Sequence, residues 1–165
     1  MTDPDKDIPA HLRHWPGLFV RENGKIVPAP AEDQAVARSY PRWPDKGPLT
    51  AGRRLTVMAR KSAYGANEEV RVIHVYEVVA PGLPVHVMGP KPVYGEYLDG
   101  RLATAELPPD EDPFAPREYD GRVATSPAAD YNYDITRYRL APGRHRLWWQ
   151  IGGLRSNTLE FEAAG

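Results

Sequence analysis

The feature that most constrains the fold is a regular alternation of side chains near the end of the chain. Between residues 145 and 151, apolar or imidazole side chains occupy every second position, and residues 158–162 repeat the alternation. Because successive side chains of a β-strand point to opposite faces, both segments are predicted to be strands with one buried face. The inward set is expected to be His145, Leu147, Trp149, Ile151, Leu159 and Phe161. The outward set is expected to be Arg146, Trp148 and Gln150.

These strands are expected to belong to a longer hairpin, 133–162, that closes the fold. Its first strand, 135–140, leads to a Pro-Gly pair at 142–143, where the two residues occupy the positions that a type II turn prefers. Similar turn signals recur upstream, because the Asn-Gly pair at 23–24 and the Asp-Gly pair at 99–100 are typical of two-residue hairpin loops. The chain is therefore expected to reverse direction many times.

Composition agrees with a chain of short strands joined by turns. The 165 residues include 18 Pro and 14 Gly, both of which are unfavourable inside helices. Strand patterns at this spacing, separated by turn signals, are typical of sandwiches and barrels. The sequence predicts an all-β protein: an antiparallel Ig-like or fibronectin-like β-sandwich with an N-terminal Pro-rich arm that carries a small hairpin.

The chain divides near Pro48. Residues 1–48 are predicted to form the arm, with a hairpin near 18–27 that packs on the body, and residues 49–165 to form the sandwich domain. Residues 70–79 are apolar on both faces of a predicted strand. Such a strand is usually central and covered on both sides, which gives the arm a surface to cover.

Charge and hydropathy exclude several classes of partner. The net charge is −1 and the basic residues are scattered, so no nucleic-acid partner is expected. No apolar run approaches the roughly 20 residues needed to span a bilayer, and no membrane span is expected. The polar start of the chain predicts a cytoplasmic protein if Met1 is the native start.

No catalytic motif is present in the sequence. None of the serines lies in a Gly-x-Ser-x-Gly elbow, and no Gly-rich phosphate loop follows a predicted strand. An enzyme is therefore not favoured, and no cofactor is expected. A weaker alternative is a copper or zinc site built from His74, His86 and Met88, which lie on neighbouring predicted strands. Their spacing matches no metal motif, and half-buried sheet residues would look the same.

The aromatic residues give the most specific functional signal. Trp148 is expected to point outward while Trp149 points inward, because adjacent strand residues face opposite sides. An outward Trp beside Arg and Tyr is the composition of a protein-binding hot spot or a sugar-stacking platform. The candidate binding residues are Trp148, Arg146, Tyr138, Tyr94 and Tyr97. The alternative is that the arm covers Trp148, through Trp15, Phe19 or Trp43.

These observations favour a non-enzymatic protein-interaction or accessory module that engages a protein partner or forms a homodimer. The first alternative is carbohydrate or small-ligand binding on the aromatic platform. The second is the metal-binding domain that uses His and Met side chains.

Overall fold

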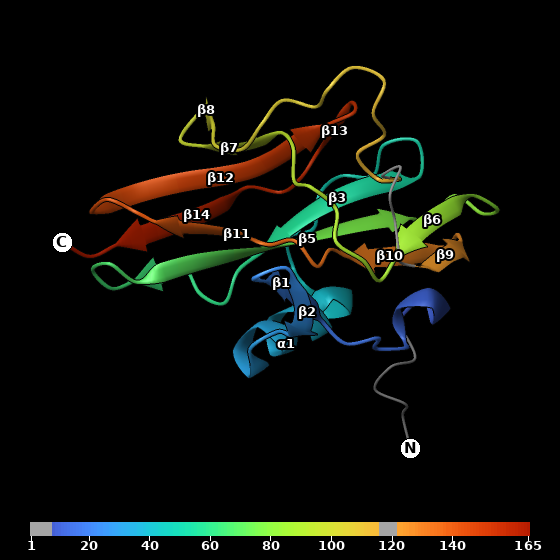
Figure 1. The fold of residues 1–165 in the computed structure, drawn as a ribbon, viewed down its shortest axis with the longest axis horizontal. Helices are drawn as coiled ribbons and strands as arrows, with labels where there is room; N and C mark the ends of the chain where they lie inside the picture. Colours follow the sequence, from blue (N-terminus) through green and yellow to red (C-terminus); the bar gives the residue numbers. More distant parts are fainter. Residues whose placement is uncertain (1–7, 116–121) are drawn as a thin grey trace.

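The computed structural model describes residues 8–115 and 122–165, and it is mostly β. Strands account for about 43% of the described residues and helices for about 9%. Figure 1 shows three layers, in which a sheet containing β5 lies between a second, larger sheet and the N-terminal arm. Among the residues described, no helix has the length and apolar character needed to cross a membrane.

The described part of the N-terminal arm holds one hairpin and three short helices. The Asn-Gly pair joins the two strands with positive φ at both residues, 51° and 76°, as a tight hairpin loop requires. Glu32 and Asp33 lie in the first turn of α1, where their negative charges interact favourably with the positive end of the helix dipole. In chain order the elements are η1 (Ala10–Leu12), β1 (Phe19–Glu22), β2 (Lys25–Pro28), α1 (Ala31–Arg38) and η2 (Tyr40–Arg42).

A four-stranded sheet forms the middle layer, with β5 at its centre. β5 pairs with β3 along one edge. Along the other edge, the first part of β5 pairs with β11 and the last part pairs with β10, and all three pairings are antiparallel. Nearly all of β5 is buried on both faces, as the two-sided apolar pattern predicts. The strands of this sheet are β3 (Arg53–Met58), β5 (Glu69–Val78), β10 (Ala128–Tyr131) and β11 (Thr136–Arg139).

A six-stranded sheet forms the outer layer around β12, the longest of its strands. β14 and β7 flank β12 on its two edges, and β4 joins β14 in parallel. Its members are β4 (Ala63–Tyr64), β7 (Glu96–Leu98), β8 (Arg101–Leu102), β12 (Gly143–Ile151), β13 (Leu154–Arg155) and β14 (Leu159–Ala163). A separate antiparallel ribbon consists of β6 (Pro84–Val87) and β9 (Arg122–Thr125).

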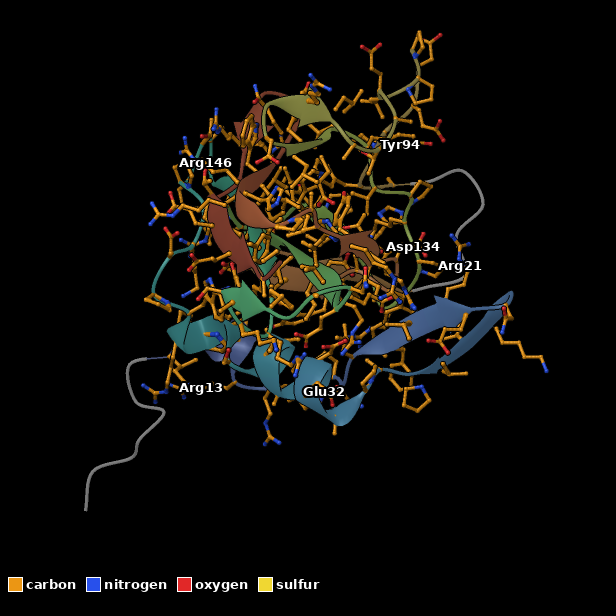
Figure 2. The ribbon with its side chains drawn as sticks, turned by 90° about the vertical axis from the view of Figure 1, so that its left-hand side faces the viewer. Arg13, Arg21, Glu32, Tyr94, Asp134 and Arg146 are labelled. Carbon is orange, nitrogen blue, oxygen red and sulfur yellow. The ribbon has the colours of Figure 1, made fainter. Side chains whose placement is uncertain are left out.

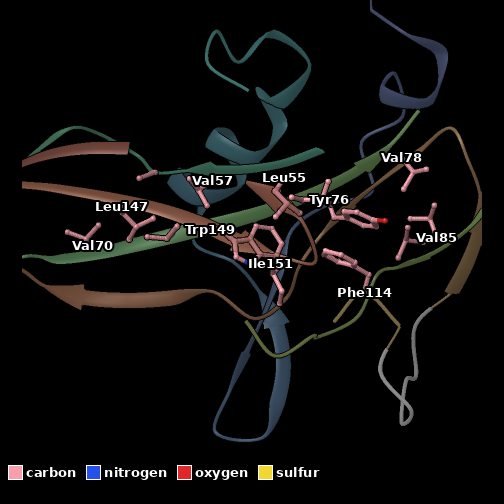
Figure 3. Packing of buried hydrophobic residues seen from close by; sticks show 14 of the residues in the cluster. Leu55, Val57, Val70, Tyr76, Val78, Val85, Phe114, Leu147, Trp149 and Ile151 are labelled. Carbon is pink, nitrogen blue, oxygen red and sulfur yellow. The ribbon is translucent and has the colours of Figure 1, made fainter. Parts of the chain in front are cut away.

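Two hydrophobic cores hold the layers together. The larger core lies between β3 and β5 on one side and β12 and β14 on the other, and Figure 3 shows Leu55, Tyr76 and Trp149 within it. The smaller core joins the arm to the opposite face of β5, where Leu18 and Tyr40 contact Ile73 and Val75 in one cluster. Burial of apolar surface on both faces makes β5 the centre of the packing.

The predicted Ig-like or fibronectin-like sandwich is wrong. Within the part of the chain that the structure describes, the strands are divided among separate sheets of four, six, two and two strands, and no Ig-like sandwich is present. The predicted hairpin over 133–162 is also divided, because β11 pairs with β5 whereas β12 pairs with β14 and β7. The turn at 142–143 reverses the chain, but the strands before and after it, β11 and β12, belong to different sheets. The residues of a turn do not determine which sheet each flanking strand joins.

The close approach of β7 to β12 depends on Gly95. Its φ is +74°, and a Cβ at this position would lie 2.2 Å from the carbonyl oxygen of Gln150. We expect Gly95→Ala to destabilise the protein by about 1–3 kcal/mol through the unfavourable backbone conformation, and further through the clash. Urea unfolding measures the effect. Gly100→Ala is the matched control, since Gly100 also has positive φ but open space around it; equal losses for the two variants would contradict the role of the contact.

Candidate functional site

The outward side of β12 carries the aromatic and basic side chains that the sequence points to. Trp148 is opposite Tyr97 of β7, Gln150 is opposite Arg155 of β13, and Arg146 is opposite Glu160 of β14. Because directly paired residues of antiparallel strands point to the same side, these groups share one surface. We call this surface the outer β12 face, and it comprises Tyr97, Arg144, Arg146, Trp148, Gln150, Arg155, Glu160 and Glu162.

A three-membered stack forms the centre of the outer β12 face. The rings of Tyr97 and Trp148 are parallel to within 9°, with 5.6 Å between their centroids. The guanidinium carbon of Arg155 lies 4.6 Å from the centroid of the Trp148 ring, within the range of a cation–π contact. Tyr97 and Arg155 come from strands on opposite edges of β12, so the half-buried indole is held between them.

Charged side chains border this stack. Arg146 lies 3.8 Å from Glu160, but their side chains are 64% and 76% exposed, so solvent weakens the ion pair. A groove of about 520 Å³ continues the face toward β4. It is lined by Ser62, Ala63, Arg144, His145, Arg146, Glu160, Phe161 and Glu162. The guanidinium of Arg146 is therefore available to a partner that approaches this face.

The structure places the remaining predicted binding residues elsewhere. Tyr138 lies on β11 in the other sheet, and its hydroxyl donates a 2.5 Å hydrogen bond to the buried carboxylate of Glu96. Tyr94 precedes β7 and packs against the larger core, while its carbonyl oxygen accepts a 2.9 Å bond from the Trp149 indole N–H. The structure therefore brings together Tyr97, Arg146 and Trp148, and it adds Arg155, which the alternation did not single out.

Residues 8–48 of the N-terminal arm, the part that the structure describes, do not provide the cover over Trp148. The Trp15 ring contacts the ring of Tyr131, and Trp15 and Trp43 pack in the smaller core on the arm side of β5. The Phe19 ring contacts that of Tyr133. Figure 2 shows the labelled Arg146 on the side of the molecule away from the arm. Among residues 8–115 and 122–165, the Tyr97 ring stacks on the Trp148 ring and the Arg155 guanidinium lies over it.

The three residues suggested as metal ligands have different surroundings. The Nε2 atom of His74 bonds to the Glu96 carboxylate in the interior. The carbonyl oxygen of His86 accepts a hydrogen bond from Lys91, and the side chain of Met88 is exposed beyond the end of β6. Residues 8–115 and 122–165 contain no group of three or more His, Cys, Asp or Glu side chains placed to hold a metal ion.

A buried carboxylate at Glu96 links the two large sheets, and sequence reasoning missed it. The Glu96 carboxylate accepts hydrogen bonds from His74 on β5 and, at 2.5 Å each, from Thr136 and Tyr138 on β11. Burial tends to raise the pKa of Glu96, but His74 and the two hydroxyl donors outweigh it and hold the pKa below its ordinary value. Nothing in the short β7 segment distinguishes this acid from a surface glutamate.

A second buried carboxylate, Glu77, links β5 to the arm. It accepts hydrogen bonds from Tyr40 at 2.5 Å, His11 at 2.7 Å and Arg54 at 2.9 Å. Burial opposes its ionisation, but these three donors lower its pKa overall. The sequence did contain a signal for Glu77. It is the single acid in the run 70–79, which is apolar on both faces, and an acid within a buried run must be paired.

No family model matches the chain, and no curated protein shows significant similarity to it. One solved structure with a partial match is the Pseudomonas fluorescens alkylpurine DNA glycosylase AlkC bound to DNA containing an abasic site analog. The match has a TM-score of 0.42 and 17% identity, and it covers 70% of this chain but 31% of that one. At this level the similarity establishes neither a shared fold nor a shared function.

Proposed function

We propose that the chain is a non-enzymatic protein-interaction module that binds its partner through the outer β12 face. The observation that carries this proposal is the Tyr97–Trp148–Arg155 stack, which stands on the solvent side of the six-stranded sheet. Trp, Tyr and Arg are the residue types that dominate the binding energy of protein interfaces. Because the stack already fixes the indole, a partner would immobilise little additional side-chain freedom on binding.

The arrangement favours a protein partner over a carbohydrate. A sugar stacks on an open aromatic ring face, whereas Tyr97 and Arg155 contact the Trp148 ring from the two sides. Tyr94 and Tyr138 are turned toward the interior, which leaves a smaller aromatic platform than the sequence indicated. The exposed guanidinium groups of Arg146 and Arg155 suit carboxylate and carbonyl groups on a protein surface.

Charge reversal of the outer β12 face is expected to weaken partner binding. The double variant Arg146→Glu/Arg155→Glu changes two exposed side chains and leaves the core intact. Affinity for the partner is expected to fall about tenfold or more, because the substitutions remove hot-spot groups and introduce like-charge repulsion. Immobilised protein is used to capture partners from a lysate of the source cells, and isothermal titration then measures the affinity of each captured protein.

The matched control is Lys25→Glu/Arg38→Glu, which makes the same change in net charge at exposed positions of the N-terminal arm. The control is expected to retain both the captured protein and its affinity. A captured protein that binds the two double variants equally well would contradict the proposed location. A protein that captures no polypeptide but whose tryptophan fluorescence responds to one glycan in a panel would favour the carbohydrate alternative.

A further inference from the structure

A lysine and an aspartate meet in the interior, away from the outer β12 face. Only 3% of Lys91 and 2% of Asp130 is exposed to solvent. The Nζ atom of Lys91 donates a hydrogen bond to Oδ2 of Asp130 and a second one, of 2.7 Å, to the carbonyl oxygen of His86. Lys91 lies in the segment after β6, whereas Asp130 lies in β10. Two segments distant in the sequence are thus joined through reactive groups.

Asn132 fixes the backbone of Lys91 at the same place. Its side-chain oxygen accepts a 2.9 Å bond from the Lys91 N–H, and its side-chain nitrogen donates a 2.9 Å bond to the Lys91 carbonyl oxygen. Asp130 and Asn132 are two residues apart and both contact Lys91, one through its side chain and the other through its backbone. The amine therefore approaches the carboxyl group in a defined position, which is the main requirement for an intramolecular reaction.

The surroundings favour the uncharged form of Asp130. A charge taken out of water costs several kcal/mol, so a dry site favours the protonated carboxyl group. Burial raises the pKa of the Asp130 carboxyl group, although the charge and hydrogen bond of Lys91, the Met88 backbone and the charge of His86 oppose this rise. The second carboxyl oxygen, Oδ1, is buried and has no hydrogen-bond partner among the described residues. An unpaired oxygen is less costly on a neutral group than on a carboxylate.

From this geometry we infer that Lys91 and Asp130 react with each other to form an intramolecular amide cross-link. The proton of the ammonium passes to the carboxylate, and the resulting neutral amine attacks the carboxyl carbon. A bond forms between Nζ and Cγ, the bond from Cγ to the hydroxyl oxygen breaks, and that oxygen leaves as water with a second proton from the amine. The reaction is a condensation, so it needs no oxidant, reductant or cofactor.

The cross-link would join the segment after β6 to β10 and enclose residues 91–130 in a covalent loop. Such a bond restricts the unfolded chain, as a disulfide does, in a protein that contains no cysteine. The neutral amide would replace the amine and the carboxyl group, so neither group could carry a charge in the interior. This modification goes beyond partner binding and does not depend on it.

Mass spectrometry of the wild-type protein tests the inference directly. Lys91 precedes Pro92, so trypsin is expected to leave it uncut, and the relevant tryptic peptides are 72–101 and 123–137. In denatured and digested protein, the two peptides are expected as one branched species, lighter than their sum by the mass of one water. Fragmentation should place the junction at Lys91 and Asp130. Detection of both peptides only as separate, unmodified species would overturn the inference and identify the contact as a simple ion pair.

Two variants serve as controls for the assignment. Lys91→Arg keeps a positive charge but replaces the amine, and Asp130→Ala removes the carboxyl carbon that is attacked. Both are expected to yield the two peptides separately, even if folding is weakened, because the digest is made under denaturing conditions. A branched species that persists in either variant would show that other residues form the link and would overturn this assignment.

Discussion

Replacing Glu96 with alanine is expected to lower the free energy of unfolding by about 3–5 kcal/mol. The substitution leaves three donors without their acceptor in the interior, from His74, Thr136 and Tyr138. Buried donors that lose their partner retain the full cost of desolvation. Because His74 comes from β5 and Glu96 from β7, the loss falls on the junction between the two large sheets.

Urea denaturation followed by circular dichroism measures this loss. Glu160→Ala is the matched control in the same sheet, since Glu160 is exposed, and its effect is expected to stay within about 0.5 kcal/mol. A loss of less than about 1 kcal/mol for Glu96→Ala would show that the Glu96 network contributes little to the packing of the sheets.

The Glu96 contribution is also expected to depend on pH. The folded pKa of Glu96 lies below its ordinary value, so the folded protein binds fewer protons at this site than the unfolded chain in the acidic range. The contribution is therefore fully present above the unfolded pKa and is lost as the pH falls through the folded pKa. The stability difference between wild type and Glu96→Gln, measured across the acidic range, should shrink in that direction. A difference that is constant with pH would contradict this sign.

The second large effect is expected at Glu77, where alanine should cost about 3 kcal/mol or more. The carboxylate holds His11 and Tyr40 of the N-terminal arm as well as Arg54 of β3. Its removal leaves the Tyr40 hydroxyl buried without an acceptor and weakens the attachment of the arm to β5. The arm should therefore open more often than the rest of the protein unfolds.

Limited trypsin digestion distinguishes opening of the arm from global unfolding. In Glu77→Ala, cleavage is expected to rise first at the exposed arginines Arg13 and Arg38, while the sheets remain intact. Glu160→Ala again provides the control and is expected to be cut at the wild-type rate. Uniform acceleration at sites throughout the chain would mean that Glu77 stabilises the protein as a whole rather than the docking of the arm.

Local chemistry predicted the turns better than the sheets. The Asn-Gly pair at 23–24 and the Asp-Gly pair at 99–100 join the paired strands β1–β2 and β7–β8. The inward positions Leu147, Trp149 and Ile151 are buried as the alternation required. These predictions succeeded because turn geometry and strand alternation depend on residues close together in the sequence.

The arrangement of the strands depends on contacts that no local pattern records. Thr56 and Met58 lie on the face of β3 opposite Leu55 and Val57, and both are buried as well. Met58 belongs to the smaller core with the arm, and the Thr56 hydroxyl accepts a hydrogen bond from the Gly47 N–H. A proline biases the residue before it away from the helical region, yet η2 forms a turn of 3-10 helix that includes Tyr40 and Pro41. The buried Tyr40 bonds to Glu77 in this conformation, so a tertiary contact overrides the local preference.

The candidate site was only partly visible in the sequence for the same reason. Alternation placed Trp148 outward, but only the register of β7 and β13 shows that Tyr97 and Arg155 lie against it. Tyr138 was grouped with Trp148 by residue type, whereas β11 carries it into the other sheet. The contact between Lys91 and Asp130 joins positions 39 residues apart and leaves no local signal.

Hydrogen–deuterium exchange of the protein, alone and saturated with its captured partner, tests the location of the binding surface most directly. The partner is expected to slow exchange in β7, β12, β13 and β14, which together carry the outer β12 face. Exchange in β1, β2 and α1 should remain unchanged, because the arm lies on the other side of the molecule. Slower exchange confined to the arm, with the β12 region unchanged, would contradict the account.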